Sequence, residues 1–327
     1  MFFALTEDQQ EFGAAVRGYL AERFDLAAVR GVVEDTDGDG NPATLWKAAG
    51  EQGWLAVTVP EEFEGLGLGL VEAQVIARAL GAGVAPGPWR GTVLAAEAIR
   101  LAGTDEQKAT WLPRLAAGAA VGALAGDRAL AAVEYGAIAD VVVTPDGLLV
   151  TGASSTPRGS YDGTVRLADL TGGTVEELAA APEIRSRAAV LVAADLVGIA
   201  REALTRTVAY DRERRQFGVP VGSFQSIKHT LADLHCTITM AEHAALYAAH
   251  AVEVGDEDAP LAVAVAKAKA GDAAVASTGA MIQYHGGIGY TWEHEAHLFY
   301  KRAKRLAGQW GDSATHRARI AELTMGG

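Results

Sequence analysis

Apolar residues recur at helical spacing along most of the chain. After Thr6 they return every three or four positions, at Phe12, Val16 and Leu20, which predicts an amphipathic helix. Thr6 can cap this helix, because Gln9 follows three residues later, as in a capping box. The same periodicity predicts further helices over residues 42–52, 70–83, 89–102, 105–117, 184–214, 223–252, 258–284 and 292–325.

Between residues 120 and 180 the pattern changes to that of strands. Asp140–Thr151 holds two β-branched runs joined by a Pro-Asp-Gly turn, which predicts a hairpin, and Thr164–Leu170 reads as a further strand. In Glu64–Gly69 glycine alternates with leucine, which favours a close-packed turn over a nucleotide-binding loop. We therefore expect a mainly α protein with a small β insert.

The predicted elements divide the chain into three parts. Residues 1–118 form an N-terminal helical domain, residues 119–182 a small β domain and residues 183–327 a C-terminal helical bundle. With half of its residues apolar, a chain of this length can bury a large core.

Charge and composition narrow the classes of partner. A net charge of −13 argues against nucleic acid and anionic membranes. There is no run of eighteen apolar residues and no basic signal at the start, so we expect a cytoplasmic protein. The single cysteine, Cys236, fits a reducing compartment and is expected to be a small core residue. We expect no metal site, with His294 and His297 at the surface.

Two C-terminal segments carry the most specific chemistry. Tyr210–Gln225 ends a long helix with a cluster of arginines, turns through glycine and proline, and resumes with an amide. Gln283–Gly289 adds a second amide and a glycine turn. Each segment alone could be an ordinary helix end, with solvated arginines or a tight turn. Their pairing favours a binding site.

The residue types in these segments suit a dinucleotide. Arg214 offers a planar fork of donors for a pyrophosphate, and Phe217 offers an apolar surface for an adenosine group. Gln225 and Gln283 can donate and accept at once, as a ribose or adenine edge requires. Glycines such as Gly287 let main chain approach a ligand closely.

These phrases, in this order, resemble the acyl-CoA dehydrogenase family. The resemblance runs nearly end to end, through Leu5–Gln10, Gly103–Lys108, Trp111–Pro113 and the two C-terminal segments. It implies an N-terminal helical domain, a middle β domain and a C-terminal four-helix bundle that builds dimers and tetramers. It also implies a half-site that grips the dinucleotide end of a neighbouring subunit's FAD. The residues expected in this half-site are Arg214, Gln216, Phe217, Gln225, Gln283, Gly286 and Gly287.

Three features that the family resemblance implies are missing from this sequence. The β region is about half the usual length, its segment Ala123–Val133 lacks the family motif, and no tryptophan lies between Trp111 and Trp292, so the isoalloxazine cradle is absent. The two positions of the family's catalytic glutamate hold Trp310 and Ala188. Ser186 and Ala189 stand where the family has an acyl-CoA-binding Asp-x-x-Arg pair.

The resemblance and the losses together indicate a subunit without a catalytic residue of its own. We expect it to complete the FAD site of a catalytic partner in an α2β2 acyl-CoA dehydrogenase. The partner would hold most of the acyl-CoA, possible substrates including a steroid side-chain CoA ester. An electron acceptor such as an electron-transfer flavoprotein would reoxidise the flavin.

Two alternatives stay open. One is a self-sufficient homo-oligomeric dehydrogenase that uses Asp312 or Glu293 as an unorthodox base. The other is a binding or scaffold protein that kept the fold and lost the flavin chemistry.

Overall fold

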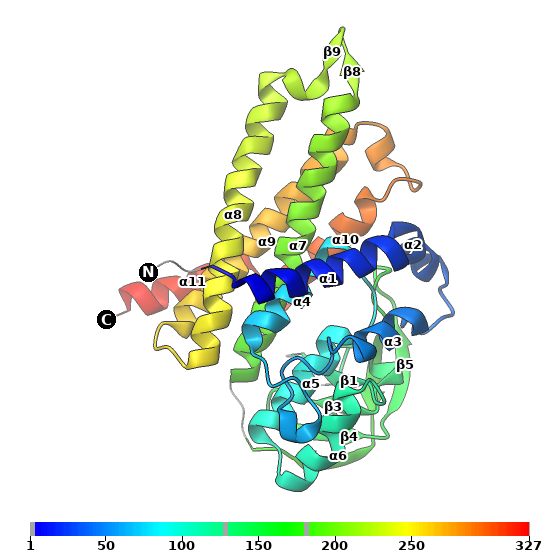
Figure 1. Ribbon diagram of the computed structural model, residues 1–327, viewed down its shortest axis with the longest axis vertical. Helices are drawn as coiled ribbons and strands as arrows, with labels where there is room; N and C mark the ends of the chain where they lie inside the picture. The colour runs from blue at the N-terminus through cyan, green and yellow to red at the C-terminus, as the bar shows by residue number, and fades with distance from the viewer. Residues whose placement is uncertain (1–3, 127–129, 180–182, 327) are drawn as a thin grey trace. The chain divides into compact units, whose positions relative to one another are not determined.

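The computed structural model describes residues 4–126, 130–179 and 183–326 (Figure 1). Its α-helices are α1 (Glu7–Arg23), α2 (Leu26–Glu34), α3 (Ala43–Glu51), α4 (Leu70–Ala82), α5 (Trp89–Ala102), α6 (Asp105–Ala116), α7 (Glu183–Glu213), α8 (Gln225–Val254), α9 (Ala259–His285), α10 (Ala296–Gly308) and α11 (Ser313–Met325). Its strands are β1 (Gly122–Leu124), β2 (Val133–Glu134), β3 (Val141–Val143), β4 (Leu148–Thr151), β5 (Ser154–Arg158), β6 (Leu167–Thr171), β7 (Thr174–Glu177), β8 (Arg215–Gln216) and β9 (Val219–Pro220). The predicted class, mainly α with a small β insert, is confirmed.

The chain forms two compact units. The first combines Met1–Leu26, Ala77–Ala85 and Ala189–Gly327, and the second combines Ala27–Ile76 and Pro86–Ala188. The chain passes between the units four times: after Leu26, within α4, after Ala85 and within α7. No helix among the described residues is long and apolar enough to cross a membrane.

Side chains at the N-termini of helices fix where two of them begin. Thr6 accepts a hydrogen bond from the main-chain N–H of Gln9, and Gln9 accepts one from the N–H of Thr6. Thr104 and Gln107 make the same reciprocal pair at the start of α6. Both capping boxes satisfy donors that a helix leaves unpaired, so the predicted start of α1 is confirmed.

The strands of the second unit form two small sheets. One has the order β1-β3-β4-β7 and the other β2-β6-β5. The predicted hairpin is present, since β3 and β4 pair antiparallel with Val142 opposite Val150. The core of this region consists of Ala123, Ala125, Val133, Val142, Val150, Ala168 and Leu170.

The glycine-leucine segment of the second unit packs as a turn. A Cβ added to Gly65 would lie 1.9 Å from the carbonyl oxygen of Val59, closer than any side chain tolerates. The main-chain N–H groups of Leu66 and Leu68 donate to the carbonyls of Ala56 and Val57. These glycines therefore serve packing, as the sequence predicted.

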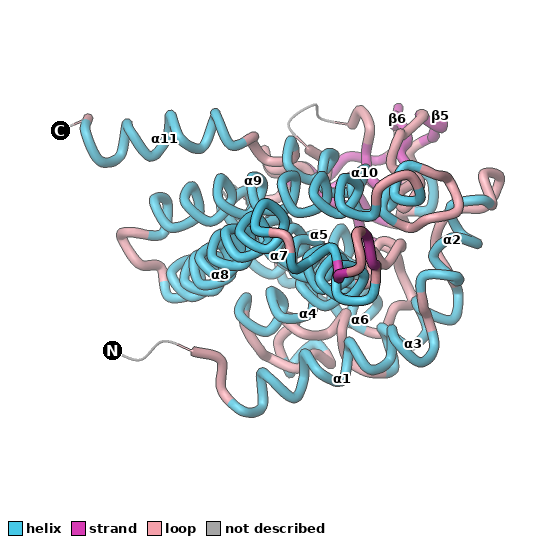
Figure 2. Tube along the Cα trace, turned by 90° about the horizontal axis from the view of Figure 1, so that it is seen from above, coloured by secondary structure: helices cyan, strands magenta, loops and turns pink. Residues whose placement is uncertain are grey.

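In the first unit, α9 lies at the centre of the C-terminal helices. It contacts α8, α10 and α11, and Figure 1 and Figure 2 both show α8 and α9 side by side. Buried alanines recur along α9 on more than one face, and Val263 and Ala268 are buried among them. An α-helix that is apolar on several sides is buried on several sides, which is the arrangement expected for this segment.

Three expectations about individual segments were wrong. The helix predicted over residues 292–325 is two helices, α10 and α11, with a turn over residues 309–312. Trp310 has φ of 54° in this turn, which no helix allows. Residues 26–34 form a helix, α2, which the sequence did not predict. Cys236 is exposed on α8, although a core position was expected.

A buried lysine stabilises the turn between α10 and α11. The Nζ of Lys267, on α9, donates to the carbonyl oxygens of Ala307 at 3.0 Å and Gly311 at 2.9 Å. The carbonyl of Ala307 lies in the last turn of α10 and has no further helical N–H to accept from, and that of Gly311 lies in the turn itself. One side chain of α9 binds both carbonyls, so a tertiary contact stabilises the break in the helix.

Glycines let α4 and α7 approach closely within the first unit. A Cβ on Gly198 would lie 2.0 Å from the carbonyl oxygen of Arg78, and a Cβ on Gly81 would lie 2.2 Å from that of Asp195. Arg302 reinforces the contact, because its guanidinium donates to the Asp195 carboxylate and to the carbonyl oxygen of Ala85. The two glycines and this buried ion pair fix the spacing of the helices.

We expect Gly198→Ala to lower the free energy of unfolding by about 2–3 kcal/mol, because the added methyl group pushes α4 and α7 apart. Gly279→Ala is the matched control, since Gly279 also lies within a helix but an added Cβ meets nothing within 4 Å. The control should gain about 0.5–1 kcal/mol from helix propensity. Urea denaturation of both variants measures the difference. Equal midpoints for the two would contradict the proposed close contact.

Candidate functional site

The first predicted segment forms a tight hairpin at the end of α7. After Glu213 the chain enters β8, turns at Phe217 and Gly218, and returns in β9. Phe217 has φ of 52° and Gly218 has φ of 83°, and two positive values are what a two-residue hairpin turn of this hand requires. Phe217 and Gly218 connect the paired residues Gln216 and Val219, and Figure 1 shows this β8–β9 hairpin at the end of α7.

The predicted binding side chains of this hairpin point away from their own chain. Arg214 is exposed, and its guanidinium has no side-chain or main-chain partner among the described residues. Phe217 is 93% exposed, and its ring meets that of Phe224 edge to face, with ring centres 6.3 Å apart. The amide of Gln216 donates to the carbonyl oxygen of Arg215. Exposed aromatic and guanidinium groups in one turn are uncommon unless something outside covers them.

The remaining predicted residues lie at helix ends. Gln225 is the first residue of α8 and Gln283 lies in the last turn of α9, and both are exposed. Gly286 has φ of 64° and ψ of −140°, a conformation open only to glycine. A Cβ on Gly286 or Gly287 would meet nothing within 4 Å. None of the described residues therefore requires a bare main chain at Gly287.

A ring stack connects the two segments. The rings of Tyr210 and His285 lie 4.4 Å apart, and the Tyr210 hydroxyl donates to the carbonyl oxygen of His285 at 3.4 Å. Tyr210 is one helical turn before Arg214, and His285 is two residues after Gln283. The structure thus brings the two segments to the same end of the first unit. Burial lowers the pKa of His285, so this ring is neutral near pH 7.

The half-site has the donors that an anionic dinucleotide end needs. Three arginines, Arg212, Arg214 and Arg215, outnumber the two neighbouring acids, Asp211 and Glu213, so this segment carries a local positive charge. Free guanidinium and amide groups can donate to phosphate and ribose oxygens. Among the described residues there is no group of three His, Cys, Asp or Glu side chains that could hold a metal ion.

The two acids considered as alternative bases have other environments. Asp312 caps α11, accepting from the N–H and the hydroxyl of Thr315, both at 2.8 Å. The hydrogen bond from the Thr315 N–H is the main reason that the pKa of Asp312 is lowered, which makes it a weaker base. Glu293 is exposed in the turn before α10.

The segment Ala123–Val133, which lacks the family motif, is described only in part, because residues 127–129 lie outside the described residues.

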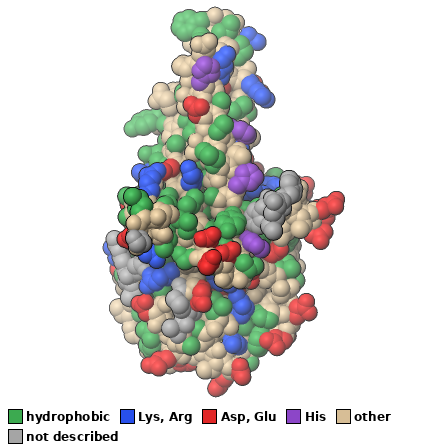
Figure 3. Space-filling view, turned by 90° about the vertical axis from the view of Figure 1, so that its left-hand side faces the viewer, with side chains coloured by type: hydrophobic (Ala, Val, Ile, Leu, Met, Phe, Trp, Pro, Cys, Tyr) green, Lys and Arg blue, Asp and Glu red, His purple; other side chains and the backbone are tan. Residues whose placement is uncertain are grey.

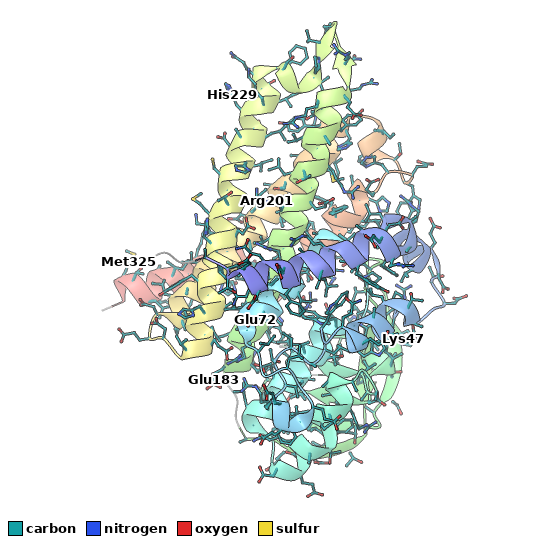
Figure 4. All side chains as sticks on the ribbon, in the orientation of Figure 1. Lys47, Glu72, Glu183, Arg201, His229 and Met325 are labelled. Carbon is teal, nitrogen blue, oxygen red and sulfur yellow. The ribbon has the colours of Figure 1, made fainter. Side chains whose placement is uncertain are left out.

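A cavity of about 470 Å³ lies beside the hairpin, between α7 and α8, and the sequence did not predict it. Apolar side chains form most of its wall, with the basic side chains of Arg212, Lys228 and His235 also lining it. Figure 4 shows the two helices beside the cavity: His229 lies near the hairpin end of α8, and Arg201 lies on α7, farther from the hairpin. The lining residues are Leu204, Val208, Asp211, Arg212, Pro220, Gly222, Ser223, Lys228, Leu231, Ala232 and His235.

Asp211 is the unusual residue of this cavity. It is 1% exposed, and neither of its carboxylate oxygens has a hydrogen-bond partner in the part of the chain that the structure describes. Burial raises its pKa to about 6. Its position three residues after Val208 and seven after Leu204 places it on the apolar face of α7, a signal that was available in the sequence.

We expect Asp211→Asn to stabilise the isolated chain above about pH 6. The folded pKa of about 6 exceeds the ordinary 3.8. The cost of the buried charge is therefore absent at low pH, grows as pH rises between these values, and is complete above them. Allowing for water that reaches the cavity, the gain is about 1–2 kcal/mol near pH 8 and about zero near pH 4. Urea unfolding at both pH values checks this.

Glu213→Gln is the matched control for this prediction, since Glu213 is an exposed carboxylate on the same turn of α7. Its unfolding free energy should change little at either pH. A gain for Asp211→Asn that is equal at the two pH values would show that the buried charge is not its cause.

Comparisons with known proteins agree with this architecture. The family model described as acyl-CoA dehydrogenase, N-terminal domain, matches residues 6–119, and the model of the C-terminal domain matches residues 185–325. Acyl-CoA dehydrogenase IpdE2 of Mycobacterium tuberculosis is 38% identical over 301 residues, which are 91% of each chain. Acyl-CoA dehydrogenase FadE34 of the same organism is 33% identical over all of this chain but over only 49% of its own length.

A solved structure extends the comparison to three dimensions. A variant of the Tcur3481-Tcur3483 steroid ACAD matches 98% of both chains with a TM-score of 0.89 and 26% identity. The match covers nearly the whole length of both chains. The chain belongs to the acyl-CoA dehydrogenase family.

Proposed function

We propose that this chain completes the FAD site of a catalytic partner subunit in a heteromeric acyl-CoA dehydrogenase, with α2β2 composition. The observation that carries the proposal is the outward-facing half-site. Arg214, Gln225 and Gln283 have free side-chain donors, and Phe217 is almost fully exposed. Family membership implies FAD, and these groups suit the adenosine diphosphate end of that cofactor.

Each residue has a distinct part in the proposed site. The fork of Arg214 would bind the diphosphate, and Phe217 would cover the adenosine. Gln225 and Gln283 would donate to ribose and adenine atoms, and Gly287 would leave room for a close approach. The bound flavin supplies the acceptor for the hydride that leaves the acyl chain. This chain's own residues bind and orient it.

The proposal assigns proton abstraction to the partner. The positions where the family carries its glutamate hold Trp310 and Ala188 here, and neither side chain can accept a proton. Asp312 is occupied as a helix cap, which argues against its use as a substitute. The acyl-CoA would accordingly lie mainly on the partner.

Two relatives support a paired assembly acting on a steroid ester. The match with FadE34 covers all of this chain but only 49% of FadE34, so about half of FadE34 lies outside the matched part. The similar solved structure is named as a steroid ACAD with two components. We therefore propose a steroid side-chain CoA ester as the substrate class, and an electron-transfer flavoprotein as the electron acceptor.

We expect co-expression with the acyl-CoA dehydrogenase chain encoded nearest to this one to give a yellow tetramer with two FAD, because each site needs both kinds of subunit. Native mass and flavin absorbance measure the ratio. One FAD per chain in a preparation of this chain alone, with dye-linked oxidation of an acyl-CoA, would support the self-sufficient enzyme instead.

In that complex, Arg214→Ala and Gln283→Ala should each weaken FAD binding, Arg214→Ala by about 10- to 100-fold, because a charge-assisted hydrogen bond is lost. Arg319→Ala serves as the control, since Arg319 is an exposed arginine on α11 that pairs with Glu322. Fluorescence measurement of FAD release compares the two half-site variants with this control. Unchanged affinity in both half-site variants would favour the scaffold alternative.

A further inference from the structure

The cavity beside the hairpin contains an acid that the proposed half-site does not use. Among the described residues no ion pair or hydrogen bond reaches the Asp211 carboxylate, and only desolvation shifts its proton affinity. The other charged or titratable groups facing the cavity are Arg212 on α7 and Lys228 and His235 on α8, all of them exposed. A buried charge without a partner is costly, so the assembled protein should supply one.

The shape and chemistry of the cavity describe the missing partner. Both carboxylate oxygens are free, and the group that donates to two such oxygens at once is the planar fork of a guanidinium. Leu204, Val208, Leu231 and Ala232 form apolar walls along the approach. These walls suit the alkyl stem of an arginine, which buries its methylene groups while its head binds an acid.

The surroundings of the cavity indicate where such an arginine comes from. Phe217 and Val219 expose apolar surface on the same hairpin, Phe224 does so just before α8, and Met240 and Tyr247 do so farther along α8. Figure 3 shows one face of the molecule, on which hydrophobic side chains lie together with basic and histidine side chains. A surface of this kind is typical of a subunit interface. A free nucleotide would bring negative charge toward a buried carboxylate, which is unfavourable.

We propose that the cavity is a socket for an arginine side chain of the partner subunit, and that its pairing with Asp211 selects the correct partner. This inference rests on the proposed heteromeric assembly. Any association that covers the cavity without supplying a donor leaves a carboxylate buried and unpaired, and is disfavoured for that reason. Asp211 would then affect which subunits associate, and not the chemistry of the flavin.

The first test compares association in the co-expressed complex. Asp211→Asn should weaken subunit association at least about tenfold, because truncating one member of a buried charged pair leaves the other unpaired. FAD per assembled tetramer should stay unchanged. Glu257→Gln is the matched control, since Glu257 is an exposed acid in the loop at the opposite end of α8. Sedimentation over a range of concentrations measures both dissociation constants.

Two outcomes of that test would overturn the inference. If Asp211→Asn associates as tightly as wild type, the cavity is not part of pairing. If association is unchanged but FAD content falls, Asp211 contacts the dinucleotide and not an arginine.

A second test uses the isolated chain and does not depend on the partner. Millimolar n-butylguanidinium chloride should raise the melting temperature of the wild-type chain in a saturable way near pH 8, with no such effect on Asp211→Asn or from n-butanol. If the wild-type chain does not associate with its co-expressed partner, the proposed function is contradicted. The guanidinium experiment then tests by itself whether the cavity binds a guanidinium group. An equal response of wild type and Asp211→Asn would refute the socket.

Discussion

The first unit depends on the close approach of α4 and α7. Main chain meets main chain at Gly81 and Gly198, and the buried pair of Arg302 and Asp195 crosses the same region. Glu242 of α8 pairs with Arg78 of α4 and Arg201 of α7, so three helices share one charged cluster. These contacts fix the path of α7, and α7 in turn carries the hairpin with its exposed donors.

Under the proposed function, this chain contributes binding groups to chemistry that its partner performs. The arginine, amides and aromatic ring of the proposed half-site lie at helix ends or in the β8–β9 hairpin, and all of them are exposed. Of the two acids considered as alternative bases, Asp312 caps a helix and Glu293 lies in an exposed turn.

Much of the fold could be predicted from periodicity and capping, since the helices and the β3–β4 hairpin are set by local sequence. The turn at residues 309–312 was not predicted: Gly311 and the Asp312 cap mark it locally, but the hydrogen bonds of Lys267 that stabilise it join residues forty or more positions apart. Cys236 was expected in the core, but it is a small residue on an exposed face of α8. The half-site segments were found from residue types, whereas burial of the Asp211 carboxylate depends on packing between α7 and α8.

The Tyr210–His285 stack has a consequence for how ligands are recognised. It ties the end of α7 to the end of α9, so the guanidinium segment and the glycine turn belong to one preorganised platform. A molecule that spans both segments meets two surfaces whose separation is already set, and less conformational entropy is lost on binding. Tight binding by a few exposed side chains is then possible without a deep pocket.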